Sequence, residues 1–358
     1  MTQRTTAGLV AVLLLGALVA WTVFKPMPFV TYEPGQTLNV LGENDGKEII
    51  QVSGAKTYRD DGELRMTTVL VSTPGARLDL FTLMTDWMNP EKAVYPYDSV
   101  YAPETTQEEN REEGQVDMVT SQDAATAAAL RELGYDVTPV IEVTAVTPGT
   151  PADGELQVRD ILLEVGGIPI KTAEDVAKAV SQAPKGKPIP FKVKRGGKDG
   201  KVVETEITPT TIDGAQRVGI RIGIGYEFPI DVTVNISDNI GGPSAGLVFS
   251  LAIYDTLTPG SMTGDQIVAG TGTIDEKGKV GPIGGIQQKI VGARDDGAVL
   301  FLVPPDNCDD ALGARNGDMR LVKAVTMHAA AQAIEKWVKN PDAKLPTCAS
   351  TTERTAVG

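Results

Sequence analysis

The chain opens with a long apolar stretch and continues in short alternations of apolar and polar residues. Twenty uncharged residues run from Thr5 to Phe24, and a helix of that length covers about 30 Å at about 1.5 Å per residue. Arg4 precedes the stretch, Lys25 follows it, and Leu18-Val19-Ala20 is a poor cleavage site. The pattern favours an uncleaved transmembrane signal anchor over a cleaved signal peptide. Residues 1–27 would then hold the cytoplasmic N-terminus and the span, with the rest of this single-pass cell-membrane protein extracytoplasmic.

The next hundred residues are predicted to form sheet, then a loop, then a helix. Four short β-rich runs are separated by turns: Leu38–Leu41, Glu48–Val52, Met66–Ser72 and Arg77–Leu80. Residues 104–117 carry six acidic residues and one basic residue, which predicts a solvated loop. A helix follows, which Ser121 can cap and Gly134 can stop.

Residues 136–212 have the pattern of a separate module. Apolar residues alternate from Ile141 to Ala145, a helix is capped by Thr172 with Asp175 three residues on, and a hairpin follows. The run VTAVTPGTPADGELQVRDILLEVGGIPI resembles a PDZ domain of the bacterial protease-associated type. That resemblance implies binding of peptide tails by strand addition.

The module departs from the PDZ pattern in one place and leaves one loop undecided. Arg159 stands where the family usually has glycine before the acid that corresponds to Asp160. Leu133-Gly134-Tyr135 either forms the carboxylate-binding loop or merely ends the preceding helix.

The last third of the chain alternates strands and helices. The expected elements are a strand at Asp231–Ile236, a helix from Ser244 to Leu257, a β region at Gln266–Ile274, a helix from Ile286 to Arg294 and a strand at Val299–Val303. Together with the earlier runs they predict an α+β fold.

Ser244 lies in GPSAG at the start of an apolar helix. Free backbone amides and the helix dipole favour negative charge there, so an oxyanion formed beside this hydroxyl would be stabilised. Pro243 has no N–H, which leaves the amides near Gly242 and of Ser244 as candidate donors. The alternative is that Ser244 is an ordinary N-cap.

Lys289 falls inside an apolar helical stripe. Ile286, Ile290 and Ala293 occupy offsets 0, 4 and 7, and Lys289 occupies offset 3. Burial would lower the lysine pKa and give an amine that accepts a proton, as a serine nucleophile without histidine requires. The alternative is a lysine whose side chain reaches along the face to water.

Together these residues resemble the proteolytic domain of Lon-type peptidases, which use a Ser-Lys dyad. The resemblance rests on MVTSQDAATAAAL, NIGGPSAGLVFSLAIYD, AGTGTIDEKGKVGPIGGIQQK and GARDDGAVLFLVPPDN. It implies that Ser244 is the nucleophile, Lys289 the base and Thr271 the residue that orients the lysine. The arrangement of anchor, PDZ module and Lon-type half is similar to the membrane-anchored, PDZ-containing Lon-like serine peptidases of bacteria.

The resemblance also implies a domain organisation and partners. A Lon-type fold would be assembled from residues 30–135 and 213–345, with the PDZ domain at 136–212 inserted and a flexible tail at 346–358. Expected partners are polypeptide substrates, peptide tails at the PDZ domain, the lipid bilayer and further copies of the chain, since Lon-type domains assemble in rings, with a hexamer as the candidate.

Two features limit the expected activity. Ile240-Gly241-Gly242 stands where Lon proteins commonly carry Lys-Asp-Gly, so no acid precedes the serine. No GxxxxGK[ST] phosphate loop is present, which predicts a peptidase independent of ATP. The expected function is therefore an ATP-independent serine endopeptidase.

Three other functions compete with this one. GPSAG also fits the elbow of α/β-hydrolases with His328 as base, but the expected strand ends eight residues before Ser244. GTGTID is a weak dinucleotide fingerprint, because Asp275 replaces its last glycine. A PDZ adaptor without proteolytic activity is the remaining alternative.

Composition excludes further classes. The formal net charge of −14 and the lack of a long basic run argue against nucleic acid. A single histidine removes multi-histidine metal sites, and neither a metal nor a cofactor is expected. Cys308 and Cys348 either pair, as suits an extracytoplasmic chain, or remain two separate thiols.

Overall fold

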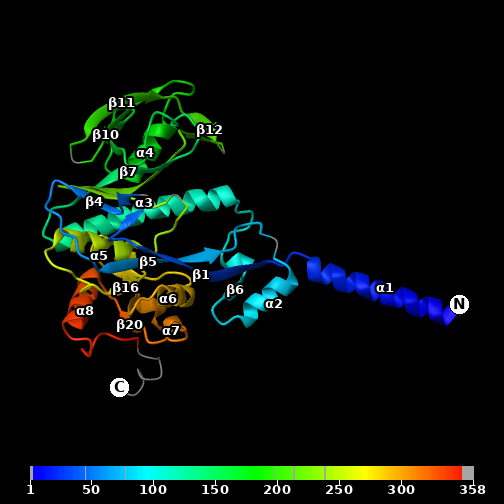
Figure 1. Ribbon diagram of the computed structural model, residues 1–358. Helices are drawn as coiled ribbons and strands as arrows, with labels where there is room; N and C mark the ends of the chain where they lie inside the picture. Colours follow the sequence, from blue (N-terminus) through cyan, green and yellow to red (C-terminus); the bar gives the residue numbers. More distant parts are fainter. Residues whose placement is uncertain are drawn as a thin grey trace, which may run out of the picture.

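A computed structural model describes residues 3–348 except 45, 77, 198, 213 and 238. Its centre is a six-stranded mixed sheet in the order β20-β19-β16-β5-β1-β6 (Figure 1). The strands are β1 (Phe29–Asn39), β5 (Glu63–Val71), β6 (Ala93–Pro96), β16 (Ile267–Gly270), β19 (Leu300–Val303) and β20 (Arg320–Lys323). β5, β16, β19 and β20 are parallel, whereas β1 pairs antiparallel with β5 and β6. Segments from both ends of the chain therefore build one sheet.

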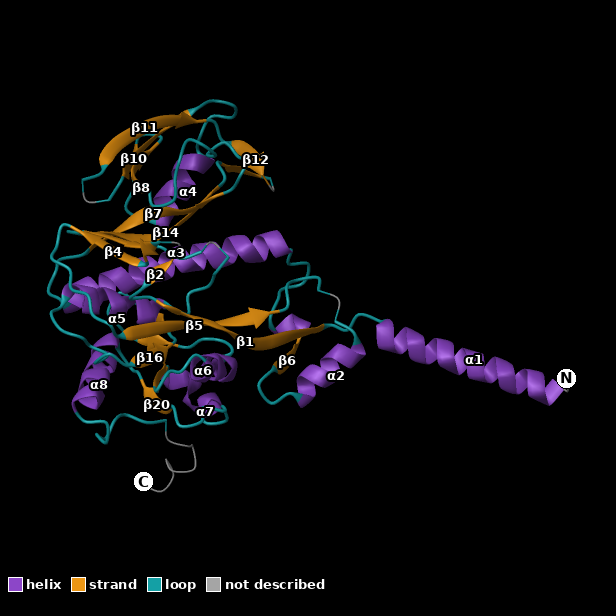
Figure 2. Ribbon diagram, viewed as in Figure 1, coloured by secondary structure: helices purple, strands orange, loops and turns teal. Residues whose placement is uncertain are grey.

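Helices cover both faces of this sheet (Figure 2). They are α2 (Leu80–Met88), α3 (Gln107–Glu132), α5 (Gly246–Leu257), α6 (Ile286–Asp295), α7 (Cys308–Ala311) and α8 (Met327–Lys339). Successive side chains of a strand point to opposite faces. Leu300 and Leu302 accordingly pack in the core under α3, α5 and α8, whereas Phe301 and Val303 pack with α6 and α7. Burial on both faces explains why β19 is wholly apolar.

A second sheet, in the order β11-β10-β8-β7-β14, forms a module above α3 in Figure 1. Its elements are β7 (Thr138–Val146), β8 (Ile161–Val165), β9 (Ile168–Pro169), α4 (Ala173–Ser181), β10 (Ile189–Arg195), β11 (Lys201–Ile207) and β14 (Ile220–Glu227). Thr172 and Asp175 form the predicted capping box of α4. The predicted hairpin pairs Phe191 with Thr205 and Val193 with Val203.

Short elements connect these bodies. They are β2 (Glu43–Asn44), β3 (Lys47–Glu48), β4 (Ile50–Ser53), η1 (Tyr97–Ser99), β12 (Thr210–Ile212), β13 (Ala215–Arg217), β15 (Asp231–Val234), β17 (Thr273–Ile274), β18 (Val280–Gly281) and η2 (Pro305–Asn307). Cys308 and Cys348 are joined by a disulfide. Residues 349–358, most of the predicted tail, lie outside the described residues.

The structure corrects two predicted elements. The segment 104–117 is mostly helical, because Thr106 forms a capping box with Glu109 and the acidic residues of the first turn suit a helix N-terminus. Ser121 is therefore a buried residue inside α3 and not its cap. The predicted strand Arg77–Leu80 is also wrong, since Asp79 caps α2 and Leu80 begins it.

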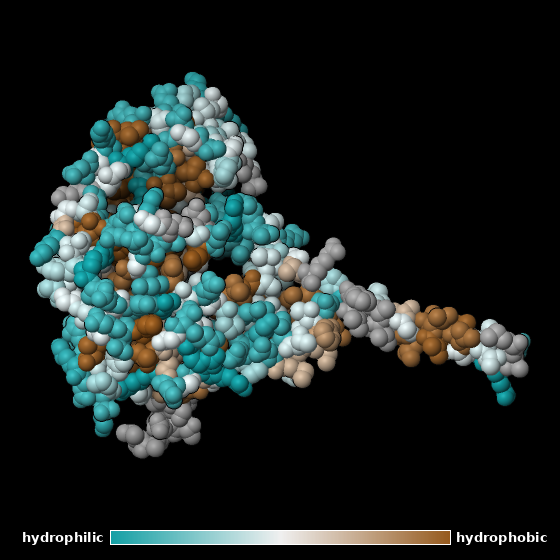
Figure 3. Space-filling model, viewed as in Figure 1, coloured by the Kyte–Doolittle hydropathy of each residue, from teal (hydrophilic) through white to brown (hydrophobic). Residues whose placement is uncertain are grey.

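The predicted transmembrane anchor is contradicted as well. Among the described residues, no helix is both long and apolar enough to cross a bilayer. The N-terminal α1 (Gln3–Phe24) projects from the body with exposed apolar side chains (Figure 3). The side chains of residues 19, 20 and 22–24 lie outside the described part. The predicted single-pass location in the cell membrane is contradicted by the same finding.

Candidate functional site

Three elements bring the predicted residues Ser244, Thr271 and Lys289 to one point. Ser244 lies two residues before α5, Thr271 directly follows β16, and Lys289 is on the first turn of α6. The loops around Ser244 and Thr271 are joined by backbone contacts. The amide of Gly272 donates to the carbonyl of Ser244 at 2.8 Å, and the amide of Leu247 donates to the carbonyl of Gly272 at 3.0 Å. The position of Ser244 is thus tied to the end of the central sheet.

The side chains of the three residues form a short hydrogen-bonded chain. Lys289 Nζ donates to Ser244 Oγ at 2.6 Å and to Thr271 Oγ1 at 3.1 Å. Thr271 Oγ1 donates to the carbonyl of Ser244 at 3.0 Å. The Thr271 hydroxyl therefore contacts both the lysine amine and the backbone of the serine, which fixes one relative to the other.

Lys289 is 3% exposed, as its place in the apolar stripe predicts. Neither of its two hydrogen-bond partners is charged. Burial disfavours the ammonium form and lowers the pKa of Lys289 to about 7. Near pH 7, Lys289 is consequently a neutral amine in a large fraction of the molecules. This amine can accept the proton of the Ser244 hydroxyl, which lies 2.6 Å away.

α6 reaches this position because two glycines, one at its N-cap and one within the helix, allow it to lie close to β5 and β1. Gly285, the N-cap, has φ +68°, and a Cβ there would lie 2.8 Å from Val69. A Cβ on Gly292 would lie 2.5 Å from the carbonyl oxygen of Gly35. Larger residues would push the helix, and Lys289 with it, away from the sheet.

The predicted oxyanion donor Gly242 is placed near the site but is already bonded. Its amide donates to the carbonyl of Gly114, in α3, at 2.8 Å. The amide of Ser244 has no hydrogen-bond acceptor among the described residues. In this state one of the two proposed donors is free and the other is occupied.

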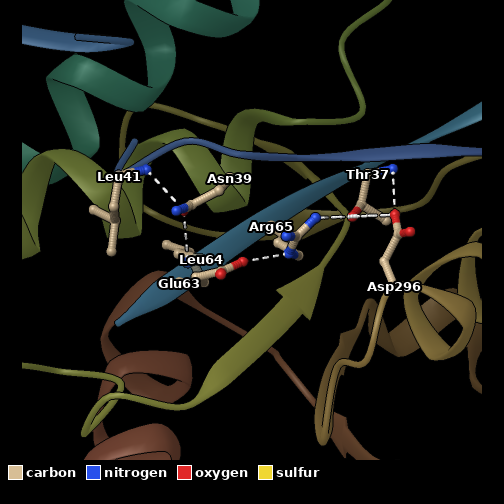
Figure 4. Close-up of polar contacts among 7 residues, drawn as sticks. All are labelled: Thr37, Asn39, Leu41, Glu63, Leu64, Arg65 and Asp296. Carbon is tan, nitrogen blue, oxygen red and sulfur yellow. Dashed lines mark hydrogen bonds and ion pairs between the residues drawn. The ribbon is translucent and has the colours of Figure 1, made fainter. Parts of the chain in front are cut away.

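An open pocket of about 620 Å³ lies over Ser244 and Lys289. Its walls come from β1, β5, the loop before Ser244 and the end of α6. Figure 4 shows how one wall is held together: the amide and hydroxyl of Thr37 donate to Asp296 at 2.9 and 2.6 Å, and Arg65 donates to Thr37 Oγ1 at 2.9 Å. Arg65 also pairs with Glu63. These contacts join β1 and β5 to the end of α6.

Sequence reasoning missed two residues of α3 that position the serine loop. Besides the Gly114 carbonyl, the Ser121 hydroxyl donates to the carbonyl of Pro243 at 2.9 Å. Gly114 and Gly241 pack backbone against backbone, since a Cβ on Gly241 would lie 3.1 Å from Gly114. A glycine in the middle of a helix costs about 1 kcal/mol relative to alanine and would have indicated a close backbone approach, but Gly114 gave no such signal because residues 104–117 were predicted to form a loop.

His328 does not join Ser244. It lies on α8 with its side chain 57% exposed, and its Nδ1 contacts Glu132 at 2.5 Å. The hydrolase alternative needs this histidine at the serine, and the geometry gives it another partner.

A second groove of about 880 Å³ lies in the smaller module, between α4 and β14. Its apolar lining includes Val176 and Val180 of α4 and Ile220 and Ile222 of β14. The undecided loop Leu133-Gly134-Tyr135 is not part of it. Gly134 has φ +81° and the amide of Tyr135 donates to the carbonyl of Leu130, so these residues end α3.

Two family models match the chain in these regions. The PDZ domain matches residues 142–195, and the Lon protease (S16) C-terminal proteolytic domain matches residues 235–332. The Lon protease of Haemophilus influenzae is 36% identical over 95 residues, which are 25% of this chain and 12% of that protein. Lon protease 2 of Herpetosiphon aurantiacus is 30% identical over 151 residues, 40% of this chain and 18% of that protein.

A solved PDZ domain of the SdrC-like protein from Listeria innocua is 27% identical over 23% of this chain and 92% of its own, with a TM-score of 0.21. The family matches and the Lon relatives support a Lon-type serine peptidase that carries a PDZ domain. The chain spans less than a fifth of the length of each of these two relatives, so the activity of the complete relatives is not assigned to it.

Proposed function

We propose that the chain is an ATP-independent serine endopeptidase in which Ser244 is the nucleophile and Lys289 the general base. The observation that supports this most strongly is the 2.6 Å contact between Ser244 Oγ and the amine of a lysine whose pKa burial lowers to about 7. A scaffold has no use for a buried amine at that distance from an accessible hydroxyl. Thr271 is proposed as a positioning residue, because its hydroxyl accepts from Lys289 Nζ and donates to the backbone carbonyl of Ser244.

The proposed reaction has two halves. Neutral Lys289 accepts the Ser244 proton as the oxygen attacks the peptide carbonyl, and the resulting ammonium donates that proton to the leaving amine. Water then attacks the acyl-enzyme, and Lys289 accepts the proton of the water and returns it to Ser244 Oγ as the acyl–oxygen bond breaks. In this proposal the free amide of Ser244 stabilises the oxyanion, and the amide of Gly242 would join it once released from Gly114.

We also propose that the peptidase fold is assembled from residues 30–135 and 213–345 around a PDZ domain inserted at 136–212, except that β14 (Ile220–Glu227) completes the sheet of the inserted module. The sheet order supports this division, because β1, β5 and β6 of the first part share one sheet with β16, β19 and β20 of the second. The groove between α4 and β14 is the proposed site for peptide tails. Assembly into a homo-oligomer stays a prediction.

The test is cleavage of unfolded casein, without ATP, by the full chain and by Ser244→Ala and Lys289→Ala. We expect both variants to lose at least about 1,000-fold in rate, as removal of a nucleophile or its base does elsewhere. Lys277→Ala, which removes an exposed lysine of the preceding turn, is the matched control and retains full activity. Equal cleavage by Lys289→Ala would contradict the proposed mechanism, and no cleavage by the parent would favour the adaptor alternative.

A further inference from the structure

One residue of α3 extends into the PDZ groove. Glu112 lines the groove together with α4 and β14. Its Oε1 accepts from the hydroxyl of Thr147 at 3.2 Å and lies 3.5 Å from Nε of Arg221. β14 is the last strand of its sheet, so in the described part of the chain one edge of its backbone is available to an added peptide strand. The Glu112 carboxylate thus presents, inside the groove, the chemical group that ends a peptide.

The same turn of α3 contacts the proposed catalytic loop. Gly114, two residues after Glu112, accepts the amide of Gly242 at 2.8 Å. Its carbonyl thereby occupies a donor that the proposed oxyanion needs. The groove and the serine loop lie on the two sides of one helical turn, and Figure 1 shows α3 running between the smaller module and the main sheet.

The two halves of α3 differ in how firmly they are held. Residues 107–117 include no buried side chain, whereas Met118 and the ten residues 121–130 are buried. A helical segment with few buried contacts opens or shifts at lower free energy than the packed remainder. Residues 107–117 are therefore held in place by the contacts of Glu112 and Gly114 and not by side chains buried in the core.

We propose that Glu112 is an internal occupant of the PDZ groove and that a peptide with a free C-terminal carboxylate displaces it. The incoming carboxylate pairs with Arg221 and repels Glu112, which releases the exposed half of α3. The Gly114 carbonyl then leaves the amide of Gly242, and that amide becomes available to the oxyanion. This inference rests on the proposed function, since it assigns a regulatory role to the same serine site.

The first experiment measures the switch without any proteolysis. Hydrogen exchange of the segment containing Gly241 and Gly242 is compared between Ser244→Ala and the double variants that add Glu112→Ala or Glu108→Ala. Glu108 is an exposed acid one turn earlier in α3 whose ion-pair partner within the described part of the chain is Arg111, so it is the matched control. We expect exchange at least about fivefold faster with Glu112→Ala and unchanged with Glu108→Ala. Equal exchange in all three chains, each shown to be folded by its melting curve, would overturn the inference.

The second experiment uses the peptide Ala-Ala-Val-Val-Val and its C-terminal amide with otherwise wild-type chains. The free acid is expected to raise casein cleavage by the parent at least about fivefold and the amide to leave it unchanged. Glu112→Ala should cleave faster than the parent without peptide and respond less to it. Cleavage that the acid peptide does not change would overturn the inference while the proposed function stands. Absence of cleavage in every chain would contradict the proposed function, and the exchange measurement would decide the inference separately.

Discussion

At the scale of single residues, burial of Lys289 destabilises the fold at low pH, but it also provides the neutral amine that the proposed role as general base requires. The folded-state pKa of about 7 lies below the ordinary value of 10.5, so the unfolded chain binds more protons between these pH values. The free energy of unfolding therefore rises with pH across this window. Below pH 7 the full penalty applies, and above about pH 10.5 it disappears.

Lys289→Met should therefore stabilise the fold while abolishing cleavage. Methionine fills a similar volume without a charge to desolvate, and the conversion of about 1.4 kcal/mol per pKa unit sets an upper bound of about 5 kcal/mol below pH 7. Denaturant unfolding at pH 6 and pH 10 measures the effect. A gain at pH 6 that shrinks at pH 10 is expected, whereas a loss of stability at both would show that the lysine is not buried as a neutral amine.

Thr271 permits a finer test of positioning. Thr271→Val keeps the shape but removes the hydroxyl that bonds Lys289 and the Ser244 carbonyl. We expect kcat to fall about 10- to 100-fold with little change in KM, and Thr271→Ser to restore most of it. A rise in KM at constant kcat would mean that Thr271 contacts substrate and does not position the lysine.

At the scale of elements, the close approach of α6 to β1 decides where Lys289 lies. Gly292→Ala would ordinarily stabilise a helix by about 1 kcal/mol, but its Cβ would lie 2.5 Å from the Gly35 carbonyl. We expect a net loss of stability and of activity, measured by thermal unfolding and casein cleavage. A gain in melting temperature would show that α6 can move without cost.

The elements of the sequence were predictable where local patterns agreed with packing. The apolar stripe around Lys289 predicted both α6 and the burial of its lysine, and Thr172 with Asp175 predicted the start of α4. The start of α3 was missed because six acids in 104–117 suggested a loop, although Thr106 and Glu109 formed a capping box. The contact of Gly114 with Gly242 joins segments far apart in the chain, and no local pattern encodes such a meeting.

At the scale of the whole molecule, a disulfide cross-links two segments of the C-terminal part of the chain. The disulfide between Cys308 and Cys348, 40 residues apart, joins α7 to the segment that follows α8. Closing a loop of that length contributes roughly 2–4 kcal/mol by restricting the unfolded chain. We expect Cys348→Ser, or reduction by dithiothreitol, to lower the melting temperature. An unchanged melting temperature would show that the two sulfurs are not joined in solution.

Whether Lys289 activates Ser244 can be measured by phosphonylation of the serine. The rate of single labelling by a fluorophosphonate is followed by intact mass from pH 5 to pH 9. Since the neutral amine is the base, the rate should fall as pH drops and reach half its maximum near pH 7. Labelling should disappear in Ser244→Ala and in Lys289→Met. A rate independent of pH, or labelling that persists in Lys289→Met, would show that Lys289 does not activate Ser244.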